Sequence, residues 1–199
     1  MKPAPFTYHA PTTISEAANM LADLEMPKLL AGGQSLMPML NMRYVFTDNI
    51  IDLNRIAGLD GVSVTNGSVE IGAMTRQRTL QRDPLIAQHV PIIRDALHWV
   101  GHVATRSRGT IGGSLSHLDP AAELPAIVAL YGGTLVVQSR RGTREISAGD
   151  WFHAYMTPAL EPDELLVSVN LPFWQKPYGY SFIELARRHG DFAIAGAAT

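Results

Sequence analysis

The 199-residue sequence contains no cysteine. This absence excludes disulfide bonds, thiolate nucleophiles and cysteine-ligated iron–sulfur clusters within the chain. It is compatible with a reducing compartment. Residues 1–6 also lack the apolar core that is typical of a signal peptide, so we expect a cytoplasmic location.

The sequence also lacks an excess of one charge and any long apolar run. Its 16 Lys and Arg residues against 18 Asp and Glu residues give a formal net charge of −2, so no basic surface predicts a nucleic-acid partner. No segment approaches the roughly 20 uninterrupted apolar residues that a membrane-spanning helix needs. The hydrophobic content of 46% is enough for one large core or two small ones. We therefore expect a globular chain without a membrane span.

The usual nucleotide-binding motifs are missing as well. Neither Gly-x-Gly-x-x-Gly nor Gly-x-x-x-x-Gly-Lys-Ser/Thr occurs. Two glycine pairs are present instead, in residues 31–35 (Ala-Gly-Gly-Gln-Ser) and 110–114 (Thr-Ile-Gly-Gly-Ser). A glycine pair alone often marks only a bend. Paired glycines with positive φ also let successive N–H groups surround an anion, and Ser35 and Ser114 add hydroxyl donors. Because two similar pairs occur, we predict a diphosphate site.

The residues around both glycine pairs resemble the FAD-binding medium subunit of molybdenum hydroxylases, the group that includes aerobic carbon monoxide dehydrogenase and xanthine dehydrogenase. Residues 31–43 are similar to the first flavin loop of that family. Residues 108–117 and 119–125 are similar to its second flavin loop and the stretch that follows. The resemblance runs from Phe6 to the last residue. It implies a two-subdomain FAD-binding fold of the vanillyl-alcohol oxidase-like (PCMH) type.

The periodicity of the chain independently predicts alternating helices and strands. A capping box, Thr13 to Glu16, begins a helix that we expect Pro27 to end. Hairpins are predicted over residues 62–71, around an Asn-Gly pair, and over residues 134–146. Because helices and hairpins interleave, we expect an α+β fold with mixed sheets and flanking helices.

Several helix boundaries follow from capping residues. We expect Thr75 to cap a short helix that runs through Leu80, and Asp119 to cap one that starts at Pro120. Residues 148–155 are predicted to be helical. Residues 192–198 favour a strand with no later segment to pair with.

The resemblance divides the chain into three parts. Residues 1–57 would form the N-terminal FAD-binding subdomain and residues 58–178 the second one. Residues 179–199 would start a C-terminal domain that is truncated here. A chain without that domain is expected to bind FAD weakly, because one side of the isoalloxazine would stay uncovered.

Family resemblance also implies which residues contact FAD. Asp119 would lie near the ribityl and phosphate part, in addition to or instead of capping a helix. Leu166 would pack against the isoalloxazine, although the residue alone is typical of an ordinary buried strand. The complete set is Leu30, Ala31, Gly32, Gly33, Gln34, Ser35, Leu36, Thr110, Ile111, Gly112, Gly113, Ser114, His117, Asp119 and Leu166.

Other polar residues are less clearly assigned. Arg106 and Arg108 flank the second glycine pair and either screen phosphate charge or face solvent. Glu184 departs from the family, in which lysine is frequent near the flavin. Residues 187–192 match a segment that lies near the ring in relatives.

Two catalytic alternatives are weak. His98 and His102 have the spacing of two metal ligands on one helix, but two ligands do not complete a site, and exposed helix histidines are the simpler interpretation. The serine, histidine and aspartate within residues 114–119 are too close in sequence to form a hydrolase triad. We therefore expect neither a metal site nor a catalytic residue in this chain.

The predicted function is electron transfer. FAD in this chain would accept electrons from 2Fe–2S clusters of a small subunit, which receives them from a molybdopterin-binding large subunit, and pass them to an external acceptor. The assembly would be a dimer of heterotrimers. Two alternatives stay open: a self-contained flavin-dependent oxidoreductase of the same superfamily, and a non-redox nucleotide-binding module.

Overall fold

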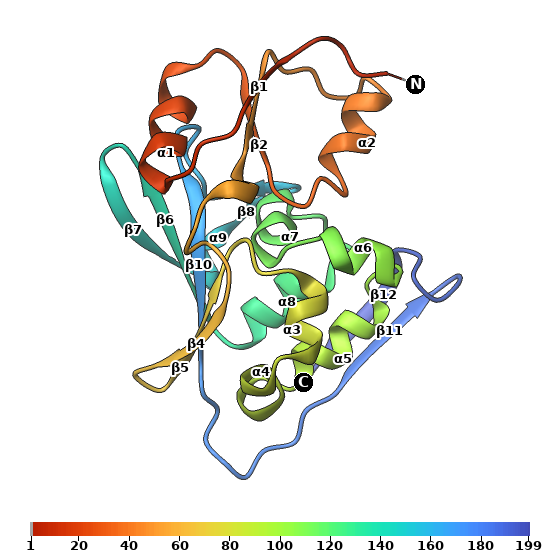
Figure 1. Ribbon diagram of the computed structural model, residues 1–199. Helices are drawn as coiled ribbons and strands as arrows, with labels where there is room; N and C mark the ends of the chain where they lie inside the picture. The colour runs from red at the N-terminus through yellow and green to blue at the C-terminus, as the bar shows by residue number, and fades with distance from the viewer. Residues whose placement is uncertain (1) are drawn as a thin grey trace.

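The computed structural model describes residues 2–199, and Figure 1 shows a small N-terminal group of elements above a larger sheet covered by helices. The N-terminal group contains a three-stranded parallel sheet in the order β1-β3-β2. Its elements are β1 (Thr7–His9), α1 (Ile14–Asp23), β2 (Pro27–Leu30), α2 (Leu36–Asn41), β3 (Asn49–Asp52) and the 3-10 helix η1 (Leu53–Arg55). β1 and β2 are its edge strands, and β3 lies between them.

The predicted capping box begins α1. The backbone N–H of Glu16 donates to Thr13 Oγ1 at 3.1 Å, and the Glu16 carboxylate accepts from the Thr13 N–H at 3.3 Å. The prediction that Pro27 ends this helix is wrong. α1 ends at Asp23, because the next residue, Leu24, has an extended conformation. Pro27 instead begins β2, a position that suits a residue without an N–H.

A five-stranded antiparallel sheet forms the centre of the molecule, in the order β4-β5-β10-β6-β7. Both predicted hairpins are present, and Asn66 and Gly67 have φ of 50° and 78°, as a two-residue turn between twisted strands requires. The late strand β10 joins the two hairpins. The strands are β4 (Val62–Thr65), β5 (Ser68–Gly72), β6 (Thr134–Ser139), β7 (Gly142–Ser147) and β10 (Leu165–Pro172).

Helices pack on one face of this sheet and enclose the larger core. Trp151 is fully buried there, and its indole N–H donates to the backbone oxygen of Leu115 at 3.0 Å. The helices are α3 (Gln77–Arg82), α4 (Pro84–His89), α5 (Ile92–Trp99), α6 (Val103–Arg108), α7 (Ile111–His117), α8 (Glu123–Leu130) and α9 (Ala148–Trp151). The core residues from strands and helices include Val69, Ile71, Leu80, Ile93, Leu97, Ile111, Leu115, Ile127, Leu135, Val137, Val169 and Leu171.

Three predicted helix boundaries are wrong. The Thr75 hydroxyl bonds both backbone groups of Gly61 instead of capping α3, which begins after Arg76. The Asp119 carboxylate accepts from the Ala121 N–H at 2.9 Å within a turn, and α8 begins four residues later at Glu123. The predicted helix over residues 148–155 is the single turn of α9, followed by β8 (Phe152–Ala154), which pairs with β9 (Thr157–Pro158).

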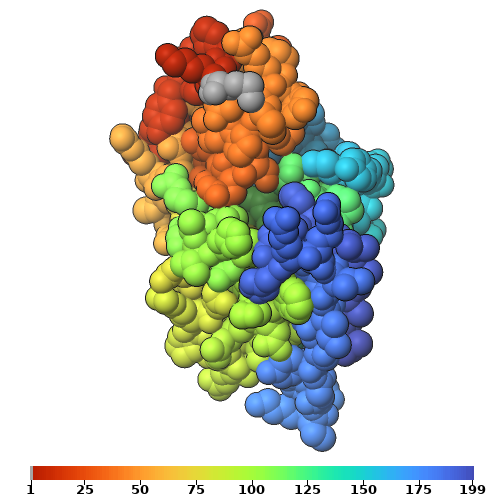
Figure 2. Space-filling view, turned by 90° about the vertical axis from the view of Figure 1, so that its right-hand side faces the viewer, coloured from red at the N-terminus to blue at the C-terminus, as the bar shows by residue number. Residues whose placement is uncertain are grey.

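The C-terminal strand has a partner, contrary to the prediction. β11 (Phe182–Ala186) pairs antiparallel with β12 (Ala193–Ala198), and Phe182 lies opposite Ala198. Figure 2 shows this blue hairpin lying against the green helices. β11 contacts α5, and β12 contacts α8.

The α+β class is confirmed. Parallel and antiparallel pairings both occur, but each keeps to its own sheet. No helix in the described range 2–199 is both long and apolar enough to cross a membrane.

Substitution of Gly112 tests the packing of α7 on Ala73, in the turn that follows β5. A Cβ at Gly112 would lie 2.6 Å from the Ala73 Cβ and 2.7 Å from the Ala73 backbone oxygen, so the backbone must move. We expect Gly112→Ala to lower the free energy of unfolding by about 1–3 kcal/mol, as overpacking of a core does. Urea denaturation measures this loss.

Gly149→Ala is the matched control, because that helical glycine has only Ser147 Oγ nearby, at 3.7 Å. Alanine in an open helical position should leave the free energy of unfolding unchanged or raise it slightly. Equal losses for the two variants would show that Gly112 is not constrained by Ala73.

Candidate cofactor-binding site

The first glycine segment, residues 31–35, connects the end of β2 to the start of α2. Gly33 has a φ of +72°, so the predicted left-handed conformation is confirmed at this glycine and not at Gly32. The backbone N–H groups of Gly33, Gln34 and Ser35 donate to no protein acceptor within residues 2–199. They are therefore available to a ligand, and successive free N–H groups suit an anion.

The second glycine segment differs from the predicted turn. Gly112 and Gly113 lie in the first helical turn of α7, and neither has a positive φ. The N–H groups of this segment already have acceptors: Thr75 O for Ile111, Ala73 O for Gly112, Thr110 Oγ1 for Gly113 and Thr110 O for Ser114, at 2.8–3.2 Å. This segment therefore offers no free N–H donor from residues 111–114. The expected positive φ is wrong here, whereas the contact of these residues with FAD stays a prediction.

The two segments nevertheless touch. A Cβ at Gly32 would lie 2.3 Å from the Arg108 backbone oxygen and 2.8 Å from the Gly109 Cα. A Cβ at Gly113 would lie 3.7 Å from that of Ala31. The glycines thus permit backbone-to-backbone contact, and the structure brings together the two groups of residues that the sequence assigns to one site.

A hydrogen-bond clamp between the half-buried Arg76 and the exposed Asn54 holds the segments in this position. The Arg76 guanidinium donates to the Arg108 backbone oxygen and to Asn54 Oδ1. Asn54 Nδ2 in turn donates to the Ala31 backbone oxygen at 3.0 Å. Burial and the neighbouring positive charge of Arg108 lower the pKa of Arg76. The sequence contains no motif that links Arg76 to Asn54, so this clamp was missed.

The other predicted site residues differ in their burial and in their distance along the chain from the glycine segments. Arg106 is buried and donates to the backbone oxygens of Val100 and Gly101, at 2.7 and 3.2 Å, so it faces neither solvent nor the glycine segments. Arg108 is exposed. His117 and Asp119 are half-buried at the end of α7 and in the turn after it. Leu166 lies in β10 as part of the larger core.

The two histidines with metal-ligand spacing belong to different elements. His98 is in α5, and His102 precedes the first residue of α6. The expectation that one helix carries both is therefore wrong. No group of three metal-binding side chains occurs in the part of the chain that the structure describes.

Two carboxyl groups outside the predicted set of FAD contacts, Glu123 and Glu184, lie near each other, and Glu123 also lies near Asp119. Burial raises the pKa of Glu123 to about 7, with further contributions from the charges of Glu184 and Asp119. Burial also raises the pKa of Glu184, whose two carboxylate oxygens are buried without a hydrogen-bond partner in residues 2–199. Buried unpaired oxygens of this kind are acceptors for a ligand's hydroxyl groups. Glu123 lies within residues 119–125, the stretch whose resemblance to the family already indicated that this region belongs to the site.

Comparison with known proteins identifies the family. A family model described as the FAD binding domain in molybdopterin dehydrogenase matches residues 4–174, so the chain belongs to this family of flavin-binding domains. More particularly, it is the FAD-binding part of a medium subunit of a molybdenum hydroxylase, similar to those of carbon monoxide dehydrogenases.

The similarity covers the whole chain. The chain is 40% identical to the 6-hydroxypseudooxynicotine dehydrogenase complex subunit alpha of Paenarthrobacter nicotinovorans. It is 37% identical to the caffeine dehydrogenase subunit beta of Pseudomonas sp. (strain CBB1). Each alignment covers 100% of this chain and 68% of the relative. The solved structure of carbon monoxide dehydrogenase from Hydrogenophaga pseudoflava superposes with a TM-score of 0.97 at 35% identity, over 100% of this chain and 69% of that one. The predicted family and the oxidoreductase class are thereby confirmed.

The raised pKa of Glu123 predicts a pH dependence of stability. Between pH 4.5 and about 7 the folded chain binds more protons at Glu123 than the unfolded chain does, so stability falls as the pH rises through this window. We expect Glu123→Gln to remove much of this fall and to be more stable than the wild type above pH 7, by up to about 3 kcal/mol. Urea denaturation at pH 5 and pH 8 measures the difference.

Glu145→Gln is the control, because Glu145 is an exposed carboxylate on β7. It should retain the wild-type dependence of stability on pH. Parallel pH profiles for Glu123→Gln and the wild type would contradict the assignment of the raised pKa to Glu123.

Proposed function

We propose that this chain holds FAD with its diphosphate against the N–H groups of Gly33, Gln34 and Ser35. The free N–H donors of this segment are the observation that carries the proposal. The contact of Gly32 with Arg108, the last residue of α6, holds the segment in place. Three successive N–H groups suit the negative charge of a diphosphate, and the Ser35 hydroxyl adds a donor.

The remaining polar groups fit the rest of the cofactor. The ribityl chain of FAD carries hydroxyl groups, and the unpaired oxygens of Glu184 and the neighbouring Glu123 are acceptors for them. Because an O–H donor satisfies a buried carboxylate, bound FAD would remove an uncompensated desolvation cost.

Thr110, Ile111, Gly112 and Gly113 would shape the site rather than donate N–H groups, and Ser114 has a side-chain hydroxyl that makes no hydrogen bond within residues 2–199. We retain Leu30, Leu36, His117, Asp119 and Leu166 as proposed contacts.

Bound FAD supplies the redox chemistry. The chain's own residues bind it, orient it and set its electrostatic surroundings, and no acid or base from this chain is required. Relatives that are named as medium chains or as subunits of dehydrogenase complexes support the assignment to an assembly.

Within that assembly, we propose that electrons pass from 2Fe–2S clusters of a small subunit, supplied by a molybdopterin-binding large subunit, through this chain's cofactor to an external acceptor. The absence of cysteine agrees with clusters that belong to a partner. We further propose that the assembly is a dimer of heterotrimers in the cytoplasm. We also propose that the chain divides into subdomains at residues 57/58 and 178/179.

A substitution at Gly33 tests the diphosphate site. Alanine with a φ near +72° is strained, and its Cβ would lie 3.2 Å from Leu30 Cδ1 and from Met37 Cγ, so the turn and its N–H groups must shift. We expect Gly33→Ala to weaken FAD binding at least about tenfold, which corresponds to roughly 1.4 kcal/mol. Calorimetric titration of FAD into each protein measures the affinity.

Gly58→Ala is a matched control, since Gly58 also has a positive φ, of +81°, but no atom lies within 4 Å of its Cβ position. Both variants carry backbone strain, and only Gly33→Ala should lose affinity. An equal loss in both, or none in either, would contradict the proposed contact. Binding of ADP but not of FAD by the wild type would favour a non-redox nucleotide-binding module.

A further inference from the structure

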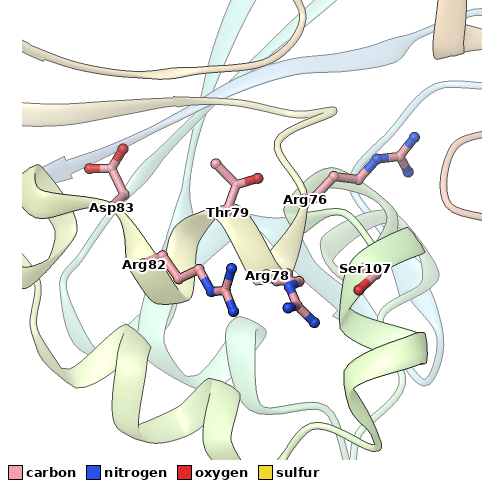
Figure 3. Close-up of a pocket in the computed structure, with 6 residues that line it drawn as sticks. All are labelled: Arg76, Arg78, Thr79, Arg82, Asp83 and Ser107. Carbon is pink, nitrogen blue, oxygen red and sulfur yellow. The ribbon is translucent and has the colours of Figure 1, made fainter.

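A concentration of positive charge lies between α3 and α6, and it shares only Arg76 with the clamp beside the site proposed for FAD. A cavity of about 410 Å³ opens there. Figure 3 shows its lining residues, Arg76, Arg78, Thr79, Arg82, Asp83 and Ser107. Three of the six are arginines, and five of the six come from α3 or its two flanking positions.

Arg78 and Arg82 have no protein partner for their charge. Neither guanidinium forms a hydrogen bond to a side chain or an ion pair within residues 2–199. They lie four residues apart on α3, and Figure 3 shows both on the same side of that helix. Like charges at this spacing repel each other, so the arrangement is unfavourable until an anion lies between them.

The other groups of the cavity do not neutralise this charge. Asp83 is its only carboxylate, and Oδ1 of that side chain already accepts from the N–H groups of Leu85 and Ile86, at 2.8 and 3.2 Å. Figure 3 shows Asp83 on the opposite side of α3 from Arg78 and Arg82. The hydroxyl of Ser107 donates to the Val103 backbone oxygen at 2.7 Å. Arg76 is fixed by Arg108 O and Asn54 and adds a third positive charge at the edge.

We propose that this cavity binds a phosphate group. A guanidinium pairs with two phosphate oxygens at once through parallel N–H donors, so two arginines can hold one phosphate from two directions. A phosphate carries close to two negative charges at neutral pH and therefore matches the two unpaired guanidinium groups, whereas one carboxylate matches only one of them. The source is either free inorganic phosphate or the phosphate of a nucleotide.

The test follows the side-chain Nε–Hε signals of arginine by NMR while sodium phosphate is added to the whole chain, with sodium chloride at equal ionic strength as reference. We expect saturable shifts at Arg78 and Arg82 with phosphate only. In the variant Arg78→Gln/Arg82→Gln, the phosphate affinity measured by calorimetry for this site should fall at least about tenfold. Arg43→Gln/Arg55→Gln removes two exposed arginines elsewhere and should leave the phosphate affinity unchanged.

The remaining outcomes are decisive in either direction. Equal shifts with phosphate and chloride, or undiminished phosphate binding in Arg78→Gln/Arg82→Gln, would overturn the proposal. Tighter binding of ADP than of phosphate at the Arg78 and Arg82 signals would support it with a nucleotide as the source, and equal binding would support it with free phosphate. The same signals are read in Gly33→Ala, so failure of the FAD assignment leaves this test intact.

Discussion

The contact between Gly32 and the backbone oxygen of Arg108 is the constraint on which the site depends. A Cβ at residue 32 would lie only 2.3 Å from that oxygen, so the two glycine segments approach as closely as they do only because no side chain separates them. The Arg76–Asn54 clamp then joins Ala31 O of the first segment to Arg108 O, two residues before the second segment. The parallel sheet that delivers the first segment and the helix that carries the second are positioned around this contact.

In the proposed site the two segments have different roles. The segment at residues 31–35 leaves three N–H groups free, whereas the segment at residues 110–114 uses its N–H groups to build α7 and to join it to Thr75 and Ala73. Free N–H groups near the surface keep water as an alternative partner, so leaving them without a protein acceptor costs little. Glu184 differs, because its carboxylate oxygens are buried and unpaired. The proposed cofactor, FAD, has a diphosphate for the first set of groups and hydroxyl groups for the second.

Local sequence signals predicted the parts of the fold that depend on local chemistry. The capping box at Thr13, the Asn66-Gly67 hairpin and the glycine pairs all have short-range causes. The family resemblance followed from the residues around the glycine pairs. Predictions that depended on distant partners were wrong or absent. The pairing of β11 with β12, the helical form of residues 111–114 and the Arg76–Asn54 clamp are set by contacts that no spacing in the sequence records. Glu184 is a similar case, since its burial depends on where β11 packs.

Amide hydrogen exchange measured residue by residue, with and without FAD, tests the central claim most directly. Without FAD, the N–H groups of Gly33, Gln34 and Ser35 should exchange rapidly, while those of Ile111, Gly112 and Ser114 should be protected by their internal hydrogen bonds. FAD should slow exchange at residues 33–35 and change the protection of residues 111–114 little. Protection at residues 33–35 without FAD, or FAD-dependent protection confined to residues 111–114, would contradict this account of the site.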